Sequence, residues 1–206
     1  MDFVAIIGDP GSGKTNMLVR QLYKEYLDGA NIISNIRSVK FPQTYMDFDK
    51  FIEAAENDDP RLDGAVIGTD EFGVGADSYE FLSERNKGLT KLNTQRRKFR
   101  LKWLYTVQRQ NFVSRRLRQL TEGYISMSDP DKRNMRFPDG TKARHHRDVC
   151  MGVFRSEFFD FDGTLIKARW FNGRKYWSLY DDRERINIRK SKGGVLVPDA
   201  GEDEDY

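Results

Sequence analysis

The sequence predicts an α/β fold with a central, mostly parallel sheet flanked by helices and a small β-rich extension at the C-terminal end. Three observations predict it. Short apolar runs alternate with segments of helical spacing over residues 1–130. A glycine-rich loop directly follows the first apolar run, and two acidic residues, Asp70 and Glu71, follow another. Such endings are typical of buried parallel strands whose carboxyl edge holds a site.

The elements are expected in a regular order along the chain. Strands are expected over 3–8, 31–36, 65–70, 102–108 and 123–128, and helices over 14–27, 48–57, 77–98 and 114–120. The run Asp58-Asp59-Pro60 ends the second helix, because proline cannot continue it. In the third helix the spacing of the apolar residues predicts these inward positions: Phe81, Leu82, Leu89 and Leu92.

The first loop, Gly8-Asp9-Pro10-Gly11-Ser12-Gly13-Lys14-Thr15, has the spacing of a Walker A phosphate loop between a strand and a helix. Its glycines allow a tight turn in which backbone N–H groups point at a phosphate, next to the positive end of the helix. Lys14 would neutralise the β- and γ-phosphates, and the Thr15 hydroxyl would hold Mg²⁺. We therefore expect a nucleoside triphosphate to bind this set: Asp9, Pro10, Gly11, Ser12, Gly13, Lys14, Thr15 and Asn16.

The acidic pair completes a Walker B pattern. Asp70 would bind Mg²⁺, and Glu71 is placed to accept a proton from an attacking water. Alone, the pair could also be an ordinary strand-to-helix cap. Together with the phosphate loop it favours an ATPase, because a kinase that phosphorylates a small substrate does not need the second acid.

Length and charge set the organisation of the chain. Its 206 residues suit one α/β core over 1–130, a β-rich extension over 131–190 packed on that core, and a flexible acidic tail over 191–206. The net charge is +3, but basic residues strongly outnumber acidic ones between Arg85 and Arg147. This asymmetry favours a polyanionic partner, although a merely soluble basic face is the alternative.

Other features exclude several classes. The single cysteine, Cys150, rules out an internal disulfide framework and favours a reducing compartment. The adjacent His145 and His146 cannot share the helical face that a two-histidine metal site needs. Apolar runs stay well short of a membrane span, and the N-terminus is expected to be a core strand rather than a signal peptide, so the chain is predicted to be soluble.

The C-terminal extension is rich in aromatic residues. Asn172-Gly173 predicts a hairpin turn there. The aromatics are expected to form the core of a small sheet, although stacking on nucleic-acid bases is the alternative. They include Phe154, Phe158, Phe159, Trp170, Phe171, Tyr176 and Trp177, together with the aliphatic Leu165 and Ile166.

Beyond the Walker motifs, three further segments resemble those of a known ATPase family: a helix ending in a basic pair, an apolar strand ending in Gln, and an Arg-rich helix. They are Leu92–Lys98, Trp103–Arg109 and Arg115–Arg118. The chain resembles the FtsK/HerA superfamily of ring-forming, P-loop DNA-pumping ATPases, which have a RecA-like, additional-strand fold. Within it, the chain is most similar to genome-packaging ATPases of double-jelly-roll viruses of archaea and bacteria. The resemblance covers roughly residues 1–130, and the late segment Tyr176–Asp181 also looks like C-terminal segments of packaging ATPases.

The resemblance implies roles for individual residues. Arg97 matches an arginine finger that acts on the neighbouring subunit, with Arg96 as the alternative, since the sequence does not orient adjacent side chains. Gln108 would be a sensor that contacts the attacking water or the γ-phosphate. The strand over 102–108 is expected between those over 3–8 and 65–70. The catalytic set is then Lys14, Glu71, Gln108 and Arg97.

The expected function is an ATP-driven, homo-oligomeric and hexameric ring that packages double-stranded viral DNA into a preformed capsid. Its partners would be duplex DNA and capsid or packaging-vertex proteins, in the host cytoplasm or the virion. Arg85, Lys87 and Lys91 are candidates for contacts with DNA phosphates. The alternatives are a filamentous-phage assembly ATPase of the Zot type, whose corresponding strand often ends in a pair like Asn35-Ile36, a nucleotide-dependent switch, and a small-molecule kinase.

Overall fold

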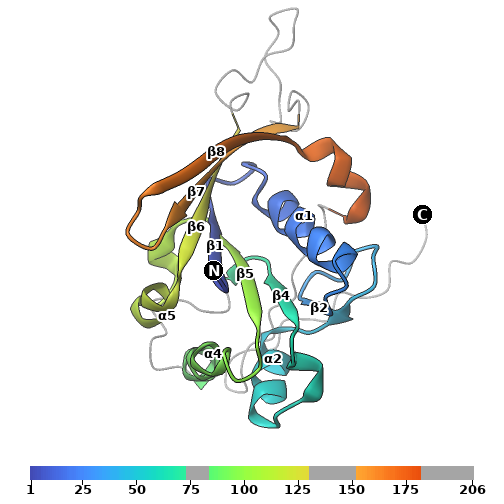
Figure 1. Cartoon of the computed structure of the whole chain (residues 1–206), viewed down its shortest axis with the longest axis vertical. Helices are drawn as coiled ribbons and strands as arrows, with labels where there is room; N and C mark the ends of the chain where they lie inside the picture. Colours follow the sequence, from blue (N-terminus) through green and yellow to red (C-terminus); the bar gives the residue numbers. More distant parts are fainter. Residues whose placement is uncertain (73–83, 130–151, 182–206) are drawn as a thin grey trace, which may run out of the picture.

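A single eight-stranded sheet, parallel except at one end, forms the centre of the computed structural model, which describes residues 1–72, 84–129 and 152–181 (Figure 1). The strand order is β3-β2-β4-β5-β1-β6-β7-β8. The strands are β1 (Phe3–Ile7), β2 (Ile32–Ser34), β3 (Thr44–Tyr45), β4 (Val66–Thr69), β5 (Lys102–Val107), β6 (Gly123–Ser128), β7 (Val153–Asp160) and β8 (Leu165–Asn172). The predicted α/β class and sheet are confirmed.

The described helices flank this sheet. They are α1 (Lys14–Leu27), α2 (Phe48–Glu56), α4 (Glu84–Gln95) and α5 (Arg115–Leu120), with short 3₁₀ turns η1 (Pro60–Leu62), η2 (Gln110–Phe112) and η4 (Gly173–Leu179). In Figure 1 α1 lies on one side of the sheet, and α2, α4 and α5 lie on the other. Within the described ranges, no helix combines the length and hydropathy needed to cross a bilayer.

The core has two layers because side chains alternate along each strand. In β1, Phe3 and Ala5 pack in the layer that also holds side chains of α2, α4 and α5, whereas Val4 and Ile6 pack in the layer of α1. Leu89 of α4 is fully buried, as its spacing predicts. Phe81 and Leu82 and the side chain of Leu92 lie outside the described residues.

The order of the central strands places the site. β5 pairs in parallel with both β1 and β4, so the strand order expected from the resemblance is confirmed. The carboxyl ends of the three strands therefore meet at one edge of the sheet. The phosphate loop follows β1, Asp70 follows β4 and Gln108 follows β5.

The C-terminal strands differ from the prediction. They extend the central sheet instead of forming a small sheet of their own, since β7 pairs antiparallel with β6 and β8 pairs antiparallel with β7. The prediction of a hairpin turn at Asn172-Gly173 is wrong. Asn172 ends β8, its Oδ1 accepts a hydrogen bond from the Arg174 N–H (3.0 Å), and Gly173 lacks the positive φ of a type I′ turn. The hairpin turn lies at 161–164, where Asp160 Oδ1 accepts the N–H groups of Asp162 and Thr164.

The burial of the C-terminal aromatics also differs from the expectation. Phe154 and Phe171 are buried against α1, but Trp170 and Trp177 are 61% and 45% exposed. For Trp170 the physical reason is position, because β8 is the edge strand and presents most of its residues to solvent, whereas Trp177 lies in η4 and not in a strand. The boundary predicted at residue 130 and the segment 191–206 lie outside the described residues.

Candidate nucleotide-binding site

The phosphate loop has the backbone geometry that its glycines predict. Gly11 and Gly13 have φ angles of 77° and 85°, in the left-handed region that glycine adopts at little cost. Ser12 N–H donates to the Asp9 carbonyl (3.1 Å), which closes the turn, and α1 begins immediately afterwards at Lys14. The buried Lys14 Nζ donates to the same carbonyl (3.1 Å). The result is a helix N-terminus opened by a glycine loop, the usual arrangement for binding phosphate.

Two polar atoms of this region are buried without a hydrogen-bond partner: Ser12 Oγ and Asn16 Oδ1. An unsatisfied buried polar atom costs roughly 1–3 kcal/mol, so such atoms are uncommon in folded proteins and call for an explanation. Their position within the loop and the first turn of α1 is where a phosphate ligand is expected.

Asp70 joins the loop to two strands. Its carboxylate accepts the Thr15 hydroxyl of α1, at 2.9 and 3.1 Å from its two oxygens, and the Thr106 hydroxyl of β5. Burial raises the pKa of Asp70 above its usual range, while the hydrogen bonds from Thr106 and Thr15 act in the opposite direction. The structure thus brings together the two residues predicted to hold Mg²⁺.

Asn35 holds the backbone of Asp70 from the neighbouring strand. Its buried amide donates to the Asp70 carbonyl (2.9 Å) and accepts from the Asp70 N–H (2.8 Å). The next residue, Glu71, has a φ of 51°, and its N–H donates to Thr106 Oγ1 (2.9 Å). No role in the site was predicted for Asn35 or Thr106 from the sequence. A signal was available, because each is a polar residue at the end of an apolar strand, where burial demands a partner.

The donor chemistry fits Mg²⁺. This cation prefers hard oxygen ligands, and protein sites usually supply only one or two of them, with substrate phosphates and water supplying the rest. Thr15 and Asp70 provide one hydroxyl and one carboxylate side by side. No group of three or more His, Cys, Asp or Glu residues suited to a metal occurs in the described ranges, so these residues offer no competing all-protein cage.

Gln108 and Arg97 lie near opposite ends of β5, at the carboxyl and amino edges of the sheet. The half-buried Gln108 follows β5 at the carboxyl edge, whereas the exposed Arg97 precedes β5 at the amino edge. β5 has six residues. Such a strand spans roughly 20 Å at about 3.3 Å per residue. Gln108 is therefore placed near the phosphate loop of its own chain, and Arg97 is not.

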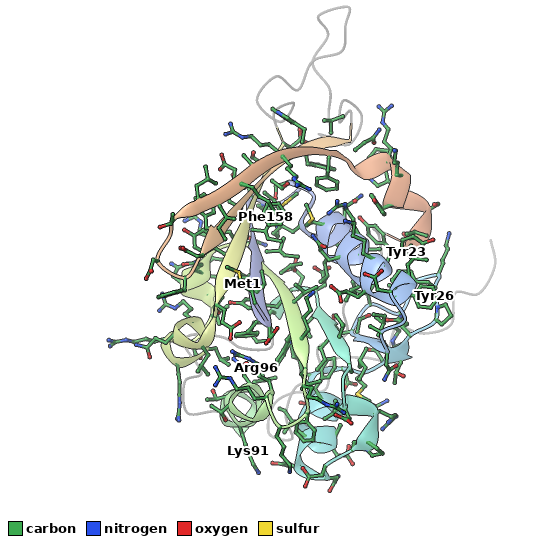
Figure 2. The ribbon with its side chains drawn as sticks, viewed as in Figure 1. Met1, Tyr23, Tyr26, Lys91, Arg96 and Phe158 are labelled. Carbon is green, nitrogen blue, oxygen red and sulfur yellow. The ribbon has the colours of Figure 1, made fainter. Side chains whose placement is uncertain are left out.

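Arg96 is occupied within its own chain. It is buried, its guanidinium donates to Asn93 Oδ1 (3.0 Å) and to the Glu122 carboxylate, and it lies over the Phe3 ring, 6.0 Å from the centroid. Figure 2 shows Arg96 on the side of α4 that faces the sheet, with Lys91 on the outer side. Of the two adjacent arginines, Arg97 is the one whose side chain faces solvent.

The candidates for DNA contact are only partly described. Lys91 is exposed, and the side chains of Arg85 and Lys87 lie outside the described residues. Some of the nearby positive charge is paired: Lys98 with Asp58 and Arg100 with Asp63, each at 2.6 Å. The basic excess seen in the sequence therefore overstates the free positive charge of this surface.

No protein-family model matches the chain, and no curated protein matches it. Solved structures do. The N-terminal domain of zonular occludens toxin from Neisseria meningitidis superposes with a TM-score of 0.60 at 17% identity, covering 88% of this chain and 100% of that domain. The genome packaging NTPase B204 from Sulfolobus turreted icosahedral virus 2, in complex with ATP-gammaS, gives 0.54 at 14% identity, covering 82% and 96%.

The ATPase domain of another protein of known structure superposes with a TM-score of 0.55 at 10% identity, covering 89% of this chain and 85% of that domain. At these identities the similarity shows the fold alone. The chain has the fold of P-loop NTPase structures.

Proposed function

We propose that this chain is a Mg²⁺-dependent ATPase. The single observation that carries the proposal is the polar network at the carboxyl edge, where Thr15 of the phosphate loop and Thr106 of β5 both bind Asp70. A merely structural glycine loop needs no buried carboxylate at its helix start, and burying one is costly unless a cation compensates it.

Each residue of the site has a role in this proposal. Lys14 and the loop N–H groups bind the β- and γ-phosphates, and Thr15 and Asp70 hold Mg²⁺, which when bound neutralises phosphate charge. Glu71, whose backbone N–H is bonded to Thr106 at the same edge, accepts a proton from the attacking water. Gln108 orients that water.

The proposal includes a neighbouring subunit. Arg97 is exposed at the amino edge, too far from the loop of its own chain to reach a phosphate there. An arginine that stabilises the transition state from this position has to act on a second copy, as in a closed ring. A homo-oligomeric ring, with a hexamer as the expected form, supplies each site with the Arg97 of the next subunit.

We propose that ATP hydrolysis drives the packaging of double-stranded DNA. Capsid or packaging-vertex proteins would be further partners. B204 supports this, since it is by name a genome packaging NTPase and its structure is of a complex with ATP-gammaS. The second candidate is a Zot-type assembly ATPase. It is favoured by the likeness to the zonular occludens toxin domain and by Asn35, which holds Asp70 at the strand end where that pattern occurs.

The test is ATP hydrolysis with Mg²⁺ measured alone, with duplex DNA and with single-stranded DNA. Lys14→Ala is the inactive control. Turnover stimulated by duplex DNA without base preference supports packaging, whereas stimulation by single strands alone favours the Zot-type candidate. Turnover with no response to DNA would contradict the motor, and tight ATP binding without turnover would indicate a switch.

A further inference from the structure

The C-terminal segment, residues 152–181, packs directly on the phosphate loop. The ring of Phe154 in β7 lies against Gly13, so closely that a Cβ on Gly13 would stand 2.8 to 2.9 Å from three ring atoms. Phe154 is only 4% exposed. The loop and the start of its helix are therefore contacted from two elements, by Asp70 at Thr15 and by this aromatic ring at Gly13.

A hydrogen bond from the phosphate-loop helix reinforces this contact. The buried Asn16 Nδ2 donates to the Gly173 carbonyl (3.1 Å), and the Gly173 N–H donates to the Gly152 carbonyl (2.7 Å), which ties η4 to the start of β7. Because the amide nitrogen of Asn16 is used in this way, its Oδ1 is the atom left buried without a partner.

The contact continues along α1. The Arg20 guanidinium lies 5.8 Å from the centroid of the Phe171 ring and 6.0 Å from that of Tyr176. Figure 1 shows the same arrangement at the level of the chain, with β8 leading into the η4 turn beside α1. The segment thus follows the phosphate loop and the first turns of its helix.

Such packing has a consequence for binding. A loop that is already fixed in its binding conformation does not lose that freedom when the ligand arrives, so preorganisation raises affinity. The Phe154 ring restrains Gly13 in its left-handed conformation, at a φ of 85°, and Asn16 fixes the first turn of α1.

We propose that Phe154 and Asn16 are positioning residues through which the C-terminal segment holds the phosphate loop in its nucleotide-binding conformation. Nucleotide affinity then depends on a segment far from the Walker motifs in the sequence. The inference rests on the proposed function only in that the ligand is a nucleotide.

The test compares two matched truncations. Phe154→Ala and Phe41→Ala each remove a phenyl ring that is 4% or 6% exposed in the same core layer, but only Phe154 contacts the loop. The affinity for a non-hydrolysable ATP analogue with Mg²⁺ is measured by calorimetry, and the thermal midpoint by scanning fluorimetry. Both variants should lose thermal stability. Phe154→Ala should weaken analogue binding about tenfold or more, and Phe41→Ala by less than about twofold. Phe154→Leu, which refills part of the space, should recover part of the affinity.

A second variant keeps the proposal testable if Phe154→Ala does not fold. A Cβ on Gly173 would stand 2.6 Å from Phe154 Cε2 and 3.1 Å from Asn16 Nδ2, so Gly173→Ala displaces both contacts without opening a cavity. It should also weaken analogue binding. Wild-type affinity in both Gly173→Ala and Phe154→Ala, or equal losses in Phe154→Ala and Phe41→Ala, would overturn the positioning role and leave the ATPase proposal intact. Failure of the wild-type chain to bind the analogue would overturn both.

Discussion

The two edges of the central strands are built differently. At the carboxyl edge, polar side chains from β5, from the end of β2 and from α1 converge on Asp70, which is 8% exposed, and its backbone and carboxylate are both hydrogen-bonded. At the amino edge the charges form separate ion pairs instead of one network. Arg96 is buried against Glu122, Lys98 and Arg100 pair with acids on the surface, and Arg97 is exposed between them.

The difference shows which parts of the site one chain can complete. The carboxyl edge contains the phosphate loop, the candidate magnesium ligands and the candidate base within one chain. The amino edge offers an arginine but no phosphate-binding loop among its described residues. In the proposed mechanism two copies of the chain complete one site, with Arg97 of one copy acting at the carboxyl edge of the other.

The largest expected effect is at the amino edge. Arg97→Ala should lower turnover by ~10³ to 10⁵-fold with little change in ATP affinity, because the arginine acts only on the transition state. Arg100→Ala is the matched control, an exposed arginine three residues away whose partner is Asp63. Steady-state ATPase rates and analogue binding separate the two effects.

Mixing tests the assignment to a neighbouring subunit. Chains carrying Arg97→Ala and chains carrying Glu71→Gln should each be inactive alone and recover some activity together, since some interfaces then combine an intact finger with an intact base. Mixed rings without any recovery would contradict the assignment, as would a monomer with full activity.

At the carboxyl edge, Glu71→Gln should lower turnover by roughly 10² to 10⁴-fold, because an amide keeps the shape of the side chain but cannot accept the proton. Analogue binding should stay near the wild-type value, in contrast to Lys14→Ala, which should lose it. A Glu71→Gln chain that hydrolysed ATP at the normal rate would remove Glu71 from the role of base.

Asn35→Ala tests how far the polar network stabilises the fold. The change leaves the buried N–H and carbonyl of Asp70 without their side-chain partner, so the free energy of unfolding should fall by about 1–3 kcal/mol. Asn31→Ala is the control, since Asn31 is exposed and donates a single hydrogen bond to the Arg61 carbonyl. Chemical denaturation measures both, and equal small losses would mean that the network contributes little to stability.

The smallest expected effect concerns DNA. Lys91 is exposed on α4, and if it contacts a phosphate, Lys91→Ala should reduce the log–log salt slope of duplex binding by about 0.9. Fluorescence anisotropy across salt concentrations measures the slope. An unchanged slope in Lys91→Ala would exclude this residue from the contact surface.

The acidic tail is tested in the same assay. Deletion of residues 201–206, Gly-Glu-Asp-Glu-Asp-Tyr, should leave the affinity for duplex DNA unchanged or tighten it.

Local patterns predicted the loop, the acidic pair and the central strands because each depends on neighbours in the sequence. The glycine spacing of the loop is recognisable from the sequence, and an apolar strand followed by Asp70 and Glu71 becomes recognisable once that loop is present. The contact of Phe154 with Gly13 could not be predicted, because it depends on which strand ends up beside the loop. The hairpin predicted at Asn172-Gly173 was wrong because a local turn pattern was trusted where Asn172 instead caps η4.

The position of β1 also has a consequence for the order of folding. Both of its neighbours in the sheet follow it only after a long stretch of chain: Phe3 lies beside Trp103, and Val4 lies beside Gly123. The partner of Asn16 comes later still, since Gly173 is 157 residues further along the chain. Contacts of such high sequence separation slow folding, because a long loop must close before any of them forms. On the ribosome the phosphate loop therefore emerges well before the segment that supports it, so a chain cut short before β7 carries the nucleotide motif without the contact from Phe154.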